Sequence, residues 1–287
     1  MIVITGATGQ LGRLVIQSLL RSVPASQIVA AVRSPEKAQD LSALGVVVRQ
    51  ADYTQPATLR TAFAGADKLL LISSNELGQR VAQHRAAIDA AKEAGVKLIA
   101  YTSVLHADTS VLGLAGEHRE TEAMLKDSGL PFVLLRNGWY TENYTASVPT
   151  ALAHGALLGS AGAGRIASAA RADYADAAAA VLTQDAQIGQ AGQVHELAGD
   201  AAYTLADLAA EVAKQSGKPV VYNDMPEAQY KAALVGFGLP ETIAGLLSDS
   251  DAGAAKGALF DDGHALSRLI GRPTTTLAAS VAAALAG

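Results

Sequence analysis

The chain has 287 residues, of which 50% are hydrophobic and 17% are charged, so it can bury a sizeable core. Its net charge of −5 provides no basic field for nucleic acid or an anionic membrane, and neither partner is expected. The absence of cysteine excludes disulfides, thiolate catalysis and CxxC zinc sites. No signal-like N-terminus and no apolar run of about 18 residues is visible, so a cytoplasmic protein is expected.

Strand and helix signals alternate over the first 136 residues. Helical spacing of apolar residues predicts helices between the strands, with Ser34-Pro35 starting the second helix and Gly95 ending a longer one. The strands are continuous apolar runs, as in strands buried on both faces, and they lie at 2–5, 28–32, 46–49, 69–72, 96–102 and 132–135. This pattern predicts an α/β fold, a Rossmann doubly wound parallel sheet.

After residue 136 the alternation stops. Segment 137–143 is polar and aromatic without periodicity, and 155–164 is rich in glycine and alanine. Further signals predict a helix at 173–182, a strand at 194–197 that rejoins the sheet, a helix after the capping box Thr204-x-x-Asp207, and a terminal helix at 277–285. We therefore expect a Rossmann domain of residues 1–136, completed by 165–198, and a smaller, mostly helical C-terminal lobe of 137–164 and 199–287.

The segment TGATGQLG (5–12) joins the first strand to the first helix with the spacing G-x-x-G-x-x-G. Gly6 would allow the sharp turn, Gly9 the close approach of a pyrophosphate, and Gly12 the close packing of the helix. The helix N-terminus offers N–H groups to the phosphates. A purely structural turn is the alternative, but the strand–loop–helix context favours dinucleotide binding. The cofactor contacts expected here are Gly6, Ala7, Thr8, Gly9, Gln10 and Leu11.

The residues that follow the next strands indicate which cofactor binds. NAD enzymes place a carboxylate after the second strand, whereas this chain has Arg33, which can pair with the 2′-phosphate of NADPH or lie free on the surface. Ser73, Ser74 and Asn75 follow the fourth strand and suit a cofactor's ribose or a helix cap. Asp52 could reach the adenine or cap the next helix. NADPH is therefore the expected cofactor.

Several segments resemble the NmrA-like atypical short-chain dehydrogenases and, within that family, the bacterial NAD(P)H:quinone oxidoreductases of type 2. These are TGATGQLG, Arg33, Asp52, Thr102-Ser103, RNGWYTENY (136–144), RADYA (171–175) and GRPTT (271–275). The resemblance implies that residues closing over the nicotinamide are Asn137, Gly138, Trp139, Tyr140, Thr141, Glu142 and Arg171. It places Asn143 and Tyr144 at the substrate; ordinary packing and a surface ion pair are the alternatives for the aromatic residues and Arg171.

The catalytic Tyr-x-x-x-Lys of standard short-chain dehydrogenases is missing, because none of the eight tyrosines has lysine four residues later. Ser103 stands at the position that resembles the family serine. His118 is the only candidate proton donor on the helix where the pair would lie, although a lone histidine is more often a surface residue. The catalytic residues are otherwise unassigned. The other histidines lack ligand spacing, so no metal site is expected.

A missing acid–base pair matters less for a quinone than for a ketone, because hydride addition to a quinone gives a delocalised hydroquinone anion. The resemblance therefore implies an enzyme, an NAD(P)H:quinone oxidoreductase, that reduces small-molecule quinones with two electrons by direct hydride transfer from NADPH. A non-catalytic NADP(H)-binding redox sensor of the NmrA type is the alternative. An isoflavone-reductase-like enzyme would need a lysine near the nicotinamide, and none lies between Lys97 and Lys126. A monomer or homodimer is expected.

Overall fold

The computed structural model describes residues 1–184 and 192–287, and they divide into two compact units. Unit 1 comprises Met1–Ala107, Gly116–Asn137 and Arg171–His195. Unit 2 comprises Asp108–Ala115, Gly138–Ala170 and Glu196–Gly287. The domain assignment made from the sequence remains a prediction, and the part of its range 165–198 that covers 185–191 lies outside the described residues.

The strands associated with unit 1 form a sheet of seven in the order β3-β2-β1-β4-β5-β6-β8. Every pairing from β3 to β6 is parallel, and the order reverses at β1. The predicted α/β fold with a doubly wound Rossmann sheet is thus confirmed. The strand bounds are β1 (Ile2–Thr5), β2 (Ile28–Val32), β3 (Val47–Gln50), β4 (Lys68–Leu71), β5 (Leu98–Val104), β6 (Phe132–Asn137) and β8 (Gln193–Leu197).

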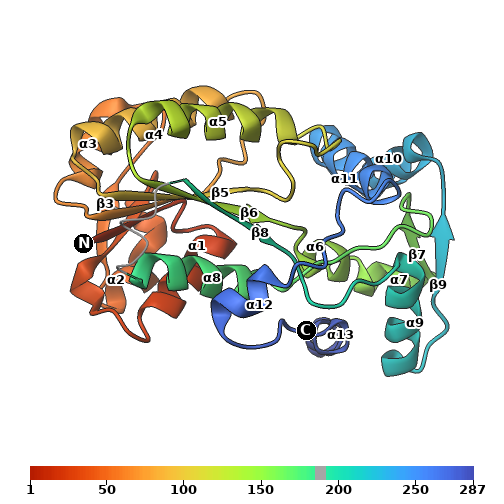
Figure 1. The fold of residues 1–287 in the computed structure, drawn as a ribbon. Coiled ribbons are helices and arrows are strands. Elements are labelled where there is room, and N and C mark those ends of the chain that lie inside the picture. Colours follow the sequence, from red (N-terminus) through yellow and green to blue (C-terminus); the bar gives the residue numbers. More distant parts are fainter. Residues whose placement is uncertain (185–191) are drawn as a thin grey trace. The chain divides into compact units, whose positions relative to one another are not determined.

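Helices cover both faces of this sheet, with α3, α4 and α5 along one face and α1 and α8 along the other (Figure 1). Adjacent strand residues such as Leu69 and Leu70 are both fully buried, which explains the continuous apolar runs. The helices of unit 1 are α1 (Gln10–Leu19), η1 (Ala25–Gln27), η2 (Pro35–Ala38), α2 (Gln39–Ala43), α3 (Pro56–Phe63), α4 (Arg80–Glu93), α5 (Ala115–Ser128) and α8 (Arg171–Thr183); the first residue of α5 belongs to unit 2.

One helix of unit 1 differs from its prediction. The helix expected to begin at Ser34-Pro35 is divided into the 3-10 turn η2 and the short helix α2. Ser34 occupies the N-cap position of η2, but within the described part of the chain its side chain makes no capping hydrogen bond. The Lys37 carbonyl accepts a hydrogen bond from Arg13 Nη2 at 2.9 Å, which ties η2 to α1.

Unit 2 is mostly helical, as predicted for the C-terminal lobe, but it also contains a small parallel sheet that the sequence did not predict. The Thr204–Asp207 capping box is confirmed, with both reciprocal hydrogen bonds present. The elements of unit 2 are α6 (Thr141–Thr145), α7 (Val148–His154), β7 (Ala156–Gly159), α9 (Leu205–Ser216), β9 (Val221–Asp224), α10 (Glu227–Gly236), α11 (Glu241–Ala254), α12 (Ala265–Ile270) and α13 (Leu277–Ala286).

Candidate functional site

The loop between β1 and α1 has the geometry of a phosphate-binding turn. Gly6 has φ +58°, a conformation that favours glycine, and its carbonyl accepts a hydrogen bond from Gly9 N at 2.9 Å. A Cβ on Gly12 would lie 2.4 Å from the Gly6 carbonyl oxygen and 2.7 Å from Ala7 Cα, so α1 packs directly on the loop. The N-cap residue Gly9 has no side chain that could cap the helix. The first-turn N–H groups of α1 can therefore bind an anion such as a pyrophosphate.

Arg13, on the first turn of α1, stabilises this loop through contacts of its guanidinium group. Its Nε donates to the Thr8 carbonyl at 3.1 Å, Nη2 donates to the Lys37 carbonyl at 2.9 Å, and Nη1 pairs with Asp40. Sequence reasoning did not single out Arg13. Its position directly after Gly12 would have been the only signal, because the partners Lys37 and Asp40 come from another part of the chain.

Arg33 follows β2 and is largely exposed, with 70% of its side chain accessible. Its Nη1 forms an ion pair with Glu76 Oε1 at 2.9 Å, and Glu76 Oε2 accepts a hydrogen bond from Gln83 Nε2 at 2.6 Å. Since β2 and β4 both neighbour β1, the residues that follow their carboxyl ends meet at one edge of the sheet. Like Arg13, Glu76 was not singled out in the sequence analysis.

Ser73, Ser74 and Asn75, which follow β4, differ in exposure. Ser74 is buried, its N–H donates to His84 Nε2 at 2.9 Å, and its hydroxyl donates to Gln83 Oε1. Its polar groups therefore hold the loop in place. Ser73 is half-buried and Asn75 is exposed, so these two are the more accessible to a cofactor.

Asp52 forms the turn that precedes α3. Its Oδ1 accepts hydrogen bonds from the Thr54 N–H at 2.9 Å and the Thr54 hydroxyl at 2.8 Å. These bonds, led by the one from the backbone, lower the pKa of the Asp52 carboxyl. The N-cap of α3 is Gln55, so Asp52 shapes the turn without being the cap, and its contact with an adenine stays a prediction.

His84 anchors the Ser74 loop to α5. The Ser74 N–H can only donate, so His84 Nε2 is the acceptor and Nδ1 carries the proton, which it donates to Thr121 Oγ1 across 3.0 Å. Burial, followed by the nearby charge of Arg80, lowers the pKa of His84 to about 3. The neutral imidazole is thus part of the folded structure.

Acid should destabilise the fold through this histidine. The folded pKa is depressed below the ordinary 6.5, so its stabilisation is present above pH 6.5 and is lost as the pH falls toward 3. We expect His84 alone to cost about 2 kcal/mol between pH 7 and pH 5. Urea unfolding at both pH values would measure this. H84Q should be less stable at pH 7 and lose less on acidification, whereas H154Q, at an exposed histidine, should keep the wild-type loss.

A buried ion pair joins α5, the helix on which the sequence analysis expected the Tyr-x-x-x-Lys pair, to β6. Arg136 Nη2 donates to Glu122 Oε2 at 2.7 Å and Arg136 Nε donates to Glu122 Oε1 at 2.9 Å, with both side chains less than 10% exposed. The Ser103 hydroxyl donates to Glu122 Oε1 at 2.6 Å. The hydroxyl of Ser103 is therefore committed to a structural acceptor.

His118, the candidate proton donor, is buried rather than on the surface. Its Nδ1 lies 2.7 Å from the Tyr101 hydroxyl. Burial, with smaller effects of Arg80 and His84, lowers the pKa of His118 well below its ordinary value. A neutral imidazole keeps one ring N–H, which is too weakly acidic to serve as a general acid at neutral pH. The structure therefore does not favour this role, and the proton donor stays unassigned.

In unit 2, side-chain hydrogen bonds fix the segment 138–144. Thr141 Oγ1 lies 2.8 Å from Ser168 Oγ, and Tyr144 donates to Asp251 Oδ1 at 3.1 Å. Burial raises the pKa of Asp251 to about 6. The hydroxyls of Thr141 and Tyr144 are thus used within unit 2. On the same segment, Trp139 is buried. The half-buried residues are Gly138, Tyr140, Glu142 and Asn143.

Two expected site residues of unit 1 lie outside this segment. Asn137 is the last residue of β6 and is buried, and its Oδ1 has no hydrogen-bond partner among the described residues. Arg171 begins α8 and is half-buried. The structure thus places Asn137 at the end of β6 and Arg171 at the start of α8. Their contact with a cofactor remains a prediction.

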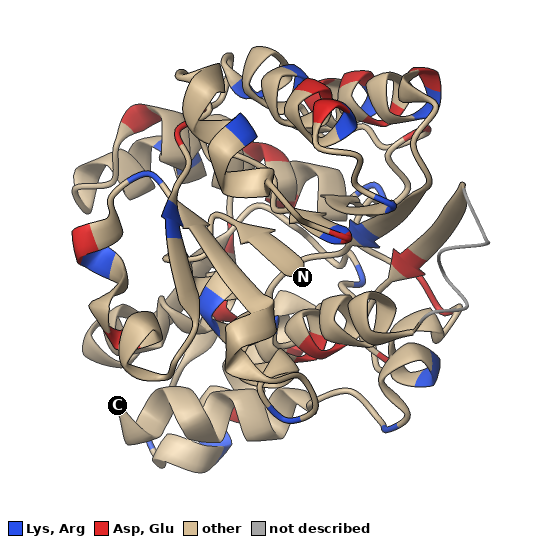
Figure 2. Cartoon of the chain, turned by 90° about the vertical axis from the view of Figure 1, so that its left-hand side faces the viewer, with Lys and Arg blue, Asp and Glu red and all other residues tan. Residues whose placement is uncertain are grey.

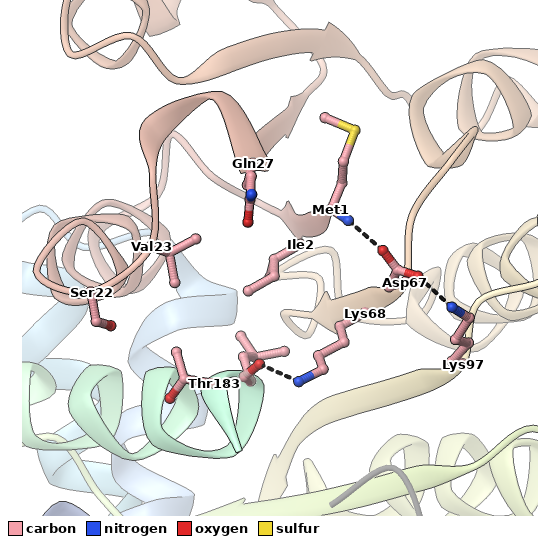
Figure 3. A pocket seen from close by; sticks show the side chains of 10 residues that line it. Met1, Ile2, Ser22, Val23, Gln27, Asp67, Lys68, Lys97 and Thr183 are labelled. Carbon is pink, nitrogen blue, oxygen red and sulfur yellow. Dashed lines mark hydrogen bonds and ion pairs between the residues drawn. The ribbon is translucent and has the colours of Figure 1, made fainter. Parts of the chain in front are cut away.

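A cavity of about 540 Å³ lies at the amino ends of the strands, opposite the carboxyl ends that Arg33 and Glu76 follow (Figure 3). Its lining includes Ile2 and Lys68, the first residues of β1 and β4, whereas dinucleotides bind at the carboxyl ends of such strands. Lys68 Nζ donates to the carbonyl of Leu182 in the last turn of α8, a favourable place for a cation. The cavity is therefore not the candidate dinucleotide site.

Three further observations concern charge, metal ligands and membrane-spanning helices. Basic and acidic residues are interspersed along the same helices (Figure 2). Among the described residues, no cluster of three or more His, Asp and Glu side chains could hold a metal ion. Over the same residues, no helix has both the length and the apolar character that crossing a membrane requires.

Known proteins share both the sequence and the fold of this chain. Residues 6–185 match the NAD(P)H-binding family. Over 281 residues the chain is 64% identical to quinone oxidoreductase 2 of Escherichia coli (strain K12), covering 98% of this chain and 97% of that protein. The crystal structure of the NADPH-dependent quinone oxidoreductase from Escherichia coli complexed with NADPH matches with a TM-score of 0.96 at 63% identity, covering 99% of this chain and all of that chain (100%).

A second reductase is also similar. The crystal structure of the Citrobacter sp. triphenylmethane reductase complexed with NADP(H) matches with a TM-score of 0.94 at 39% identity. The match covers 99% of this chain and 100% of that chain.

Proposed function

Because the chain belongs to the NAD(P)H-binding family, we propose that it is an NADPH-dependent quinone oxidoreductase. The observation that carries the proposal is its 64% identity, over 98% of its length, to a protein named quinone oxidoreductase 2. The resemblance noted in the sequence and the geometry of the loop from Gly6 to Gly12 support the same function. The alternative, a sensor that binds NADP(H) without turnover, has less support, because both similar proteins named above are reductases.

The cofactor fits the residues present. The Gly6–Gly12 turn and the first-turn N–H groups of α1 would hold the pyrophosphate, and Arg33 would hold the 2′-phosphate. Ser73 and Asn75 would lie at the ribose. We assign the nicotinamide end to residues 137–142 and Arg171, and the quinone to Asn143 and the ring of Tyr144, whose hydroxyl is used by Asp251.

The reaction places few demands on acid–base groups. NADPH supplies a hydride when it is bound, and the quinone takes up that hydride and one proton to become a hydroquinone. The Ser103 hydroxyl is committed to Glu122, and His118 is buried with a lowered pKa. We therefore infer that the protein works mainly by orienting the two reactants and that water supplies the proton.

Steady-state oxidation of NADPH by the purified, flavin-free protein tests the function. With simple benzoquinones as acceptors we expect saturable turnover that prefers NADPH to NADH. Tight binding of NADPH without turnover on any quinone would instead support the sensor. Failure to bind either nucleotide would contradict both functions.

Replacing Arg33 tests the choice of cofactor. R33A removes the charge that would pair with the 2′-phosphate, so we expect KM for NADPH to rise about ten- to a hundredfold while KM for NADH changes little. R60A is the matched control, because Arg60 is an exposed arginine of the same unit in an ion pair with Glu93. Equal changes of KM for the two nucleotides in R33A would exclude Arg33 as the phosphate ligand.

A further inference from the structure

We propose that Glu76 limits the preference for NADPH over NADH by competing with the 2′-phosphate for Arg33. The proposal rests on the proposed function, in that Arg33 is taken as the ligand of this phosphate. It concerns a residue that no general feature of the fold assigns, because the carboxylate of NAD enzymes follows the second strand, whereas Glu76 follows the fourth.

Both carboxylate oxygens of Glu76 have partners. One of its oxygens, Oε1, pairs with Arg33 Nη1 at 2.9 Å, and the other, Oε2, accepts from Gln83 Nε2 at 2.6 Å. Gln83 is itself buried, and its Oε1 accepts from the Ser74 hydroxyl. The Ser74 backbone is fixed in turn by His84 and Arg80. The carboxylate is thus presented to Arg33 by a chain of hydrogen bonds that ends in the buried part of α4.

This arrangement affects the two nucleotides differently. A 2′-phosphate that binds Arg33 must share the guanidinium with Glu76 or displace it, and it carries negative charge toward a carboxylate that Gln83 holds in place. NADH brings no such charge. Its 2′-hydroxyl can donate a hydrogen bond to a carboxylate, as it does to the acidic residue of NAD enzymes. The carboxylate therefore works against NADPH alone.

Binding of both nucleotides to E76Q tests the proposal. The amide keeps the shape of Glu76 and can still accept from Gln83, but it removes the charge. By calorimetry at low ionic strength, we expect Kd for NADPH to fall about three- to tenfold in E76Q and Kd for NADH to stay equal or rise. E36Q is the matched control, because Glu36 is exposed in η2 and forms no ion pair with any described residue. It should leave the ratio of the two Kd values unchanged.

Three results would overturn the proposal. Weaker binding of NADPH by E76Q would mean that Glu76 positions Arg33 for the phosphate. An unchanged ratio would mean that the ion pair has no part in selectivity. A ratio that R33A leaves unaltered would remove Arg33 from the phosphate site. Since the readout is binding, a lack of quinone turnover would contradict the proposed reaction and leave this test intact.

Discussion

We expect G12A to bind NADPH more than a hundredfold more weakly and to lose about 3 kcal/mol or more in the free energy of unfolding. The physical reason is steric. The added Cβ would lie 2.4 Å from the Gly6 carbonyl oxygen and 2.7 Å from Ala7 Cα, and both are backbone atoms that cannot rotate away. The helix α1 must then move off the loop. That movement carries its first-turn N–H groups away from the position in which they can hold a pyrophosphate.

Two other glycines provide graded controls. A Cβ on Gly9 would lie 3.1 Å from the Gly6 carbonyl oxygen, so G9A requires only a small shift and should cost less stability than G12A. A Cβ on Gly116, within α5, would meet no described atom within 4 Å apart from its chain neighbours and the nearby backbone of its own helix. G116A should therefore be neutral or stabilising by up to about 1 kcal/mol. Calorimetric binding and urea unfolding would rank the three. G12A behaving like G116A would refute the steric argument.

The parts of the molecule that the sequence predicted correctly depend on local requirements. The glycine loop is readable because a sharp turn and a close helix approach each need glycine within a few residues. The strand at 28–32 was predicted with its observed bounds, since a strand buried on both faces is apolar throughout. The capping box at Thr204 was equally local, because both partners lie within one helical turn.

The parts that were missed depend on which segments fold together. Glu76 meets Arg33 only because β2 and β4 lie on either side of β1. In the sequence, α2, β3, α3 and β4 separate these two residues. The strands β7 and β9 have four residues each, and most of β9 is exposed, so neither shows a buried apolar run. Asn143 and its neighbours were treated as aperiodic, yet they form α6, a helix of five residues that is too short for a helical pattern to show.

The buried ion pair of unit 1 is another feature that the sequence did not reveal. The sequence showed that the catalytic Tyr-x-x-x-Lys was missing, but it did not show that Glu122 pairs with Arg136. Glu122 lies on α5 and Arg136 on β6, and they meet because α5 packs against the sheet. Ser103, which stands at the position that resembles the family serine, donates its hydroxyl to Glu122. The structure thus gives this hydroxyl a structural partner that the sequence alone did not reveal.

Removing the carboxylate of this pair should have a large effect on stability. In E122A the guanidinium of Arg136 stays buried without its bidentate acceptor, so we expect the free energy of unfolding to fall by about 3–5 kcal/mol. The control is E93A, at an exposed carboxylate that pairs with Arg60 across 3.8 Å, where the loss should stay below about 1 kcal/mol. Urea unfolding of the two variants measures the difference. Equal losses would contradict the role given to the buried pair.

Replacing Ser103 tests whether its hydroxyl serves the buried ion pair or the reaction. S103A removes one of the hydrogen bonds that Glu122 accepts and leaves the two from Arg136, so a loss of about 1 kcal/mol is expected. Its kcat with a benzoquinone should stay within about threefold of wild type, since a hydroxyl already donated to Glu122 is not the proton donor. A standard short-chain dehydrogenase would respond in the opposite way, with stability kept and turnover lost. That opposite result in S103A would place Ser103 at the substrate and return acid–base catalysis to this site.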